Sequence, residues 1–243
     1  MSELYEEKAR IELQRWERKV CKEGFFAKKY AKKLQTKIND RIPEKVHQLF
    51  TTSIKNMVYA TLVGSEYTTA TIPLEGATLE ERELKLQEKI KLYKKTAAIE
   101  GAGTGAGGIL LGIVDFPLLL SIKMKFLFEA ASLYGFDVKD YRERLYILYL
   151  FQLAFSSDKK RKEVFEKLKN WEEIKEQLPQ KDIYLEEIDW KAFQLEYRDH
   201  IDLLKLLQLI PGFGAIVGAF ANYHFLEILG ETAKNGYRMR TLM

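Results

Sequence analysis

Residues 101–121 read GAGTGAGGILLGIVDFPLLLS, and this stretch decides the fold class. Six glycines fall in its first twelve positions, and Asp115 is its only acidic residue. Gly103, Gly105 and Gly108 match the spacing of a dinucleotide-binding loop, but such a loop must follow a β-strand. The preceding sequence, KLQEKIKLYKKTAAIE, has the period and composition of a helix. The stretch is therefore predicted to be a glycine-rich helical segment and not a phosphate-binding loop.

A second glycine-rich apolar stretch, IPGFGAIVGAF, occupies residues 210–220. In both stretches glycines recur four residues apart, which leaves a groove on one helix face where another backbone can approach closely. Each glycine also costs a helix about 1 kcal/mol relative to alanine, so the segments need a compensating contact. We expect the two stretches to pack against each other near the centre of the molecule. The glycines assigned to this contact are Gly101, Gly105, Gly108, Gly112, Gly214 and Gly218.

The rest of the chain also has helical periodicity. No alternating run is long enough to indicate a β-sheet. The fold class predicted is all-α, with one domain over residues 1–243 that comprises basic amphipathic helices at 1–42 and a helical core at 43–243. Loops or linkers are expected at 64–77 and 179–187. Besides the glycine-rich stretches, helices are expected at residues 4–22, 43–63, 78–97, 117–134, 137–155, 159–177 and 189–204.

Positive charge is concentrated near the N-terminus. Residues 18–41 hold nine basic and two acidic residues. Aromatic and basic residues fall on opposite sides of a helix there, and such helices suit anionic lipid surfaces. The alternative is a helix that packs its apolar side into the core and leaves its lysines in water. The candidate membrane-surface residues are Phe26, Lys28, Lys29, Tyr30, Lys32 and Lys33.

No second basic stretch or base-stacking motif accompanies this segment, so no nucleic acid partner is expected. The N-terminal residues lack the apolar core of a signal peptide, and the single cysteine, Cys21, fits a reducing compartment. We therefore expect a cytoplasmic protein that associates peripherally with the inner face of the cell membrane.

Two apolar runs, 101–122 and 206–226, pass the length screen of about 20 residues for a membrane span. Pro117 and Pro211 interrupt them and leave roughly 21 to 22 Å of helix at 1.5 Å per residue. A hydrocarbon core is about 30 Å thick. The runs therefore suit a re-entrant or interfacial hairpin, or the core of a domain, better than a full crossing.

Asp115 is an isolated carboxylate in an apolar stretch, which is costly unless it is hydrogen-bonded. One interpretation is an N-cap for the helix that contains Pro117. The other is a polar group that faces a ligand or ion cavity, and Asn222 is the second candidate for such a polar site.

Three blocks of the chain resemble the EcsC family: GAGTGAGGILLGIVDFPLLLS, FEAASLYGFD and IPGFGAIVGAFANYHFLEILGETAKNGYR. Bacterial members include one encoded beside the two-component Ecs ABC transporter. The resemblance implies association with a membrane transport system and, as partners, transporter subunits, but it supplies no catalytic residues. The positions that match are Gly101, Gly105, Asp115, Pro117, Tyr134, Gly135, Pro211, Gly214, Gly218 and Asn222.

Enzyme signatures are sparse. His47, His200 and His224 are the only histidines, and no HExxH, CxxC or repeated ExxH pattern accompanies them. A hydrolase that uses a metal, or Cys21 with His47, stays an alternative, as does a soluble adaptor of the transporter ATPase. No cofactor or metal is expected. The leading expectation is a non-enzymatic, membrane-associated helical protein that binds lipid, peptide or an ABC-transporter subunit.

Overall fold

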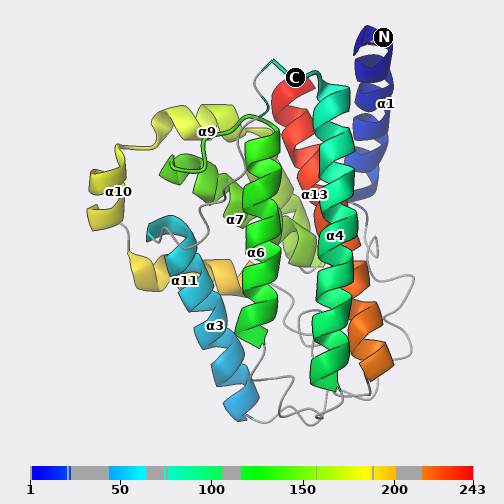
Figure 1. Cartoon of the computed structure of the whole chain (residues 1–243). Coiled ribbons are helices and arrows are strands. Elements are labelled where there is room, and N and C mark those ends of the chain that lie inside the picture. The colour runs from blue at the N-terminus through cyan, green and yellow to red at the C-terminus, as the bar shows by residue number, and fades with distance from the viewer. Residues whose placement is uncertain are drawn as a thin grey trace.

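The computed structural model describes residues 2–20, 22, 44–63, 74, 76–105, 116–156, 158–187, 189–200 and 215–242. The regular elements of these residues are all α-helices, arranged as a bundle (Figure 1). The predicted all-α fold is therefore confirmed, whereas the assignment of one domain stays a prediction. Among the described residues, no helix combines the length and apolar character that a bilayer crossing requires.

A long antiparallel helix pair organises the bundle. It consists of α4 (Leu79–Gly105) and α13 (Ala215–Leu242), which make the most extensive helix contact of the described part (Figure 1). Because the helices run in opposite directions, the end of α4 lies beside the start of α13. Pairs along the contact are Glu83 with Arg238, Ile90 with Gly230, and Lys94 with Glu227.

Four more helices complete the bundle: α1 (Ser2–Val20), α3 (Glu44–Val63), α6 (Phe116–Leu133) and α7 (Tyr141–Phe155). Of these, α1 contacts the pair directly, and α3 packs on α6 and α7. The last two are buried over most of their length, because apolar residues cover almost every side of each helix. The ring centroids of Phe50 and Phe116 lie 4.1 Å apart, which fixes the beginning of α3 against the beginning of α6.

The remaining helices cover one side of α7. They are α8 (Asp158–Lys169), α9 (Trp171–Gln177), α10 (Lys181–Glu187) and α11 (Trp190–His200) (Figure 1). One continuous helix over 159–177 was expected, but it breaks at Asn170, after which Trp171 packs 5.3 Å from the ring of Tyr146. The expected linker at 179–187 instead contains α10, whose Tyr184 ring lies 4.9 Å from that of Tyr141.

Local signals placed several helix ends correctly. At the expected helix start at residue 78, Thr78 and Glu81 form a capping box: Glu81 Oε2 accepts from the Thr78 backbone N at 2.8 Å, and Thr78 Oγ1 accepts from the Glu81 N at 3.3 Å. Gly135 ends α6 with φ 89°, the left-handed conformation that glycine adopts without strain. The helix expected over 137–155 begins later, at Tyr141, and its N-cap is Asp140, because Asp140 Oδ1 accepts from the Arg142 N at 2.9 Å.

Candidate functional site

Four helix ends meet at one end of the bundle, which we call the Gly105 end (Figure 1). There α4 finishes at Gly105, while α3, α6 and α13 begin at Glu44, Phe116 and Ala215. Contacts between the helices require this arrangement, because α6 and α13 both run antiparallel to α4. The described helix ends next to the two glycine-rich stretches, and the beginning of α3 that follows the basic segment, therefore lie at the same end.

Two exposed apolar side chains lie near the Gly105 end: Ile99 is 72% exposed and Leu118 is 48% exposed. On α4, Ile99 shares a surface with Leu92 and with the exposed Lys91 and Lys95. We call Lys91, Leu92, Lys95 and Ile99 the outer face of α4. Apolar residues flanked by lysines on one exposed helix face are typical of surfaces that contact lipid headgroups.

A buried lysine lies just inside the Gly105 end. Lys123 on α6 has no exposed surface, and its Nζ donates to the Leu119 backbone O and to Asn222 Oδ1, each at 3.2 Å. Asn222 on α13 is also fully buried. The lysine thus links α6 to α13, and it brings Asn222, the predicted polar-site residue, into a polar contact.

Lys123 has only neutral partners in the described part of the chain. Burial lowers the pKa of its ammonium to about 7, because the charged form loses its hydration without gaining a carboxylate. Lys123 was not among the site residues predicted from the sequence, although a signal for it exists there. It follows directly on the apolar run LLLSI and falls on the buried face of its helix.

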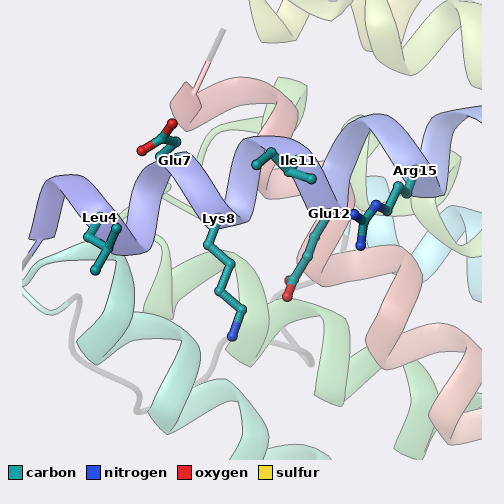
Figure 2. Close-up of a pocket in the computed structure, with 6 residues that line it drawn as sticks. All are labelled: Leu4, Glu7, Lys8, Ile11, Glu12 and Arg15. Atoms are coloured by element: carbon teal, nitrogen blue, oxygen red, sulfur yellow. The ribbon is translucent and has the colours of Figure 1, made fainter.

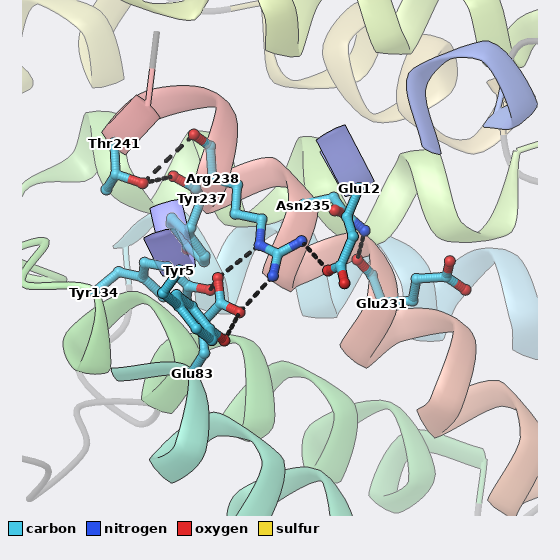
Figure 3. Close-up of polar contacts among 9 residues, drawn as sticks. All are labelled: Tyr5, Glu12, Glu83, Tyr134, Glu231, Asn235, Tyr237, Arg238 and Thr241. Atoms are coloured by element: carbon cyan, nitrogen blue, oxygen red, sulfur yellow. Dashed lines mark hydrogen bonds and ion pairs between the residues drawn. The ribbon is translucent and has the colours of Figure 1, made fainter. Parts of the chain in front are cut away.

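A second polar cluster (Figure 3) lies towards the opposite end of the bundle, where α4 begins and α13 ends (Figure 1). Arg238 donates from Nε and Nη2 to the two oxygens of Glu83, each at 2.6 Å, and from Nη1 to Glu12 Oε2 at 2.9 Å. Tyr5 donates to Glu83 Oε2 at 2.8 Å, and burial together with this carboxylate raises the pKa of Tyr5 to about 12. The cluster joins α1, α4 and α13.

A third cluster likewise joins a buried arginine of α13 to a buried carboxylate. Arg240 donates from Nη2 to Glu143 Oε1 at 2.9 Å, and Lys175 reaches the same oxygen at 2.7 Å. Burial alone would raise the pKa of Glu143, but these two cations hold it below its usual value. The guanidinium carbon of Arg240 also lies 3.8 Å from the ring centroid of Phe136. Since both clusters pair every charge, they are structural ties and not sites with a free reactive group.

A cavity of about 450 Å³ lies along α1 (Figure 2). Its described lining comes from that helix alone: Leu4, Glu7, Lys8, Ile11, Glu12 and Arg15. Leu4 is 74% exposed, and carboxylates and cations alternate along the same face. The mixture of charges offers no convergent set of groups for a defined ligand.

Several predicted site residues fall outside the described residues, so their roles stay predictions. For Gly101, Gly105 and Gly218 only the helical backbone is described. The predicted contact between the glycine-rich stretches is therefore untested, although α4 and α13 do bring the two stretches to the same end. The residues outside are Phe26, Lys28, Lys29, Tyr30, Lys32, Lys33, Gly108, Gly112, Asp115 and Gly214.

Close helix contacts at glycine do occur farther along α13. A Cβ atom added to Gly230 would lie 2.7 Å from Ile90 Cδ1 on α4, and one added to Gly236 would overlap Leu150 Cδ2 on α7. Both glycines lie within α13. Side chains of neighbouring helices therefore approach α13 closely at glycines that were not among those predicted from the four-residue spacing.

Residues of the enzyme alternatives do not converge in the described part. No group of three His, Cys, Asp or Glu side chains there is arranged to hold a metal ion. His224 Nδ1 lies 3.4 Å from Glu227 Oε2, and Glu196 accepts from Lys167 at 3.0 Å. Cys21 and the side chains of His47 and His200 lie outside the described residues.

Comparison with known proteins gives one family. The sequence pattern of the EcsC protein family matches residues 7–242. Protein EcsC of Bacillus subtilis (strain 168) is 49% identical over 227 residues, covering 93% of this chain and 92% of that protein. Uncharacterized protein YdbA of the same organism is 30% identical over 147 residues, covering 60% of this chain and 53% of that protein. No solved structure matches.

Proposed function

This chain belongs to the EcsC protein family, and from that premise we propose that it is a non-enzymatic protein that binds an anionic membrane surface and is accessory to a transport system. The resemblance includes one bacterial member encoded beside an ABC transporter, which supports transporter subunits as further partners.

The observation that carries the proposal is the Gly105 end. There α4 ends and α6 and α13 begin, within or next to the glycine-rich stretches, and α3 begins a few residues after the basic segment at 18–41. Ile99 and Leu118 expose apolar surface near these helix ends. Basic and apolar groups at one end of a protein provide both terms of interfacial binding, which are electrostatic attraction and shallow insertion. The other end also exposes the apolar residues Leu4 and Leu84, but exposed carboxylates such as Glu7, Glu81 and Glu88 accompany them.

Vesicle flotation tests this proposal. The protein should float with vesicles that contain phosphatidylglycerol, and binding should weaken as salt screens the charges. Each lysine near anionic headgroups contributes about 1 kcal/mol, so changing Lys28, Lys29, Lys32 and Lys33 to Glu should lower binding by at least about 100-fold. A protein that floats with no vesicle at low salt would overturn the proposal.

A matched control uses four exposed lysines on other helices. Lys162, Lys169, Lys181 and Lys191 lie on α8, α10 and α11. Changing these four to Glu alters the net charge equally, and flotation should then fall only by the small amount that the change in overall charge causes. Equal losses in both variants would show that net charge, and not the basic segment, drives binding.

Transporter association is tested separately. The tagged protein should co-purify with ABC-transporter subunits of its own organism, both in detergent and after the quadruple Lys-to-Glu change. Co-purification with a subunit in the absence of any vesicle binding would favour the soluble adaptor over the membrane-binding protein.

A further inference from the structure

The outer face of α4 combines exposed apolar and cationic groups on a narrow strip. Leu92 is 55% exposed and Ile99 is 72% exposed, and they lie two helical turns apart, roughly 10 Å along the axis. Lys91 comes directly before Leu92, and Lys95 lies between Leu92 and Ile99. All four lie on the same side of the helix, because residues three, four and seven apart share a helix face.

The two lysines differ from their neighbours on α4 in having no counter-ion within the described chain. Lys94 pairs with Glu227 at 3.1 Å, and Lys85 pairs with Glu88 at 3.1 Å. Lys91 and Lys95 are exposed without such an ion pair in the part that the structure describes. This half of α4 therefore presents uncompensated positive charge beside exposed apolar side chains.

An aromatic residue borders the same surface. Tyr223 on α13 is 44% exposed, and the Lys94 ammonium lies 4.0 Å from its ring centroid. Tyrosine is enriched at the boundary between hydrocarbon and water because its ring is apolar and its hydroxyl is polar. The seam between α4 and α13 thus extends the outer face of α4, and Glu227 at this seam is paired with Lys94.

We propose that the outer face of α4, made of Lys91, Leu92, Lys95 and Ile99, docks onto an anionic lipid bilayer. This inference rests on the proposed membrane function and adds a second contact, separate from the basic segment at 18–41. The lysines meet lipid phosphates, while Leu92 and Ile99 enter the boundary between headgroups and acyl chains.

A second copy of this chain is a poorer occupant of the face. Two-fold packing would bring the same lysines together from both copies, and like charges repel. A stable protein interface also buries at least about 1,200 Å² in total, which two isolated apolar side chains do not supply. A bilayer requires only shallow insertion and provides the negative charge itself.

The geometry also defines an orientation. Ile99 lies closer to the Gly105 end than Leu92, and Leu84 lies two turns farther away on α4 with 54% of its surface exposed. If both the Gly105 end and the outer face of α4 contact the bilayer, α4 is tilted with Ile99 deepest. Insertion should then decrease in the order Ile99, Leu92, Leu84.

Site-specific fluorescence tests this order. In a Cys21→Ser background, single cysteines replace Ile99, Leu92 or Leu84 and carry a polarity-sensitive dye, and Ile183→Cys on α10 is the control because Ile183 is also exposed, at 45%. With phosphatidylglycerol vesicles the emission should rise about two-fold or more at 99, less at 92, least at 84, and stay unchanged at 183. Unchanged emission at both 99 and 92 while the protein floats would overturn the proposal and leave the membrane function standing.

Charge variants test the lysines. Replacing Lys91 and Lys95 by Gln should lower the vesicle partition coefficient about 25-fold at low salt, at about five-fold for each lysine near the headgroups. The control pair, Lys162→Gln with Lys169→Gln on α8, should change it less than three-fold. Equal effects of the two pairs would refute docking by the outer face of α4, whereas absence of vesicle binding by the unchanged protein would refute the membrane function as well.

Discussion

Arg238 and Glu83 are 155 positions apart in the chain and form a buried two-point ion pair, with both nitrogen-oxygen distances at 2.6 Å. Their side chains are 3% and 1% exposed. The pair ties the last turns of α13 to the first turns of α4 and sets the register of the longest helix contact.

Breaking this pair should destabilise the protein strongly. Glu83→Gln leaves the Arg238 guanidinium buried without its main counter-charge, so we expect the free energy of unfolding to fall by about 3 to 5 kcal/mol in urea titrations. The control, Glu88→Gln, removes an exposed pair with Lys85 and should cost less than about 0.5 kcal/mol. Similar losses in the two variants would contradict the structural role of the Arg238 cluster.

Stability should rise with pH because of Lys123. Its pKa is about 7 in the folded protein and about 10.5 when unfolded, so between these values the unfolded chain binds more protons. The free energy of unfolding therefore increases from pH 7 towards pH 10 by up to a few kcal/mol, and below pH 7 this penalty is fully present. Urea titrations at several pH values check this.

Two variants isolate the contribution of Lys123. Lys123→Met removes the titrating group and should flatten the rise between pH 7 and 10. Asn222→Asp places a carboxylate at the site of the Asn222 Oδ1 acceptor, so it should keep the ammonium charged and also flatten the rise. An unchanged slope in both variants would show that other groups cause the pH dependence.

The close approach at Gly230 should make an alanine substitution there destabilising, although alanine in place of glycine usually stabilises a helix. Gly230→Ala forces Ile90 to move and should destabilise by about 1 to 2 kcal/mol, despite the better helix propensity of alanine. In an Ile90→Ala background the space is open, so the same change should stabilise by about 0.5 to 1 kcal/mol. Thermal unfolding of the unchanged protein, the two single variants and the double variant measures these effects. Additive changes in stability would argue against the contact between Gly230 and Ile90.

Gly135 and Gly76 form a second matched pair. Both have left-handed φ values, 89° and 70°, so alanine is strained by about 1 to 2 kcal/mol at each. A Cβ at Gly135 would also lie 2.8 Å from Arg82 Nη1, whereas none would be crowded at Gly76. Gly135→Ala should therefore lower the melting temperature more than Gly76→Ala, and the reverse order would contradict the crowding by Arg82.

Local signals predicted the parts of the fold that depend on neighbouring residues. The capping box of Thr78 and Glu81 and the helix end at Gly135 were recognisable because each motif satisfies its own backbone groups within a few positions. The prediction of a linker at 179–187 was wrong, because burial of Tyr184 against Tyr141 stabilises α10. That contact joins residues far apart in the chain and does not show in the local sequence.

Long-range pairing was not predictable from spacing. Nothing in the sequence joins Glu83 to Arg238, because many carboxylates and arginines are compatible with a helix surface. Glycine spacing indicated that close helix contacts exist, but the described contacts fall at Gly230 and Gly236, where the register of α13 against Ile90 and Leu150 decides which glycine is crowded. The role of Asn222 in a polar site stays a prediction, and its hydrogen bond with Lys123 was not foreseen, because the two residues are 99 positions apart.

The position of α13 in the chain has a consequence for biosynthesis. Arg238 and Arg240 neutralise buried carboxylates of α4 and α7, yet the ribosome makes α13 after every other described helix. Until it emerges, Glu83 and Glu143 have no arginine to meet, so the earlier helices cannot close into the final bundle. Nascent chains arrested before residue 215 should be cleaved rapidly by added protease, and chains that include α13 should resist.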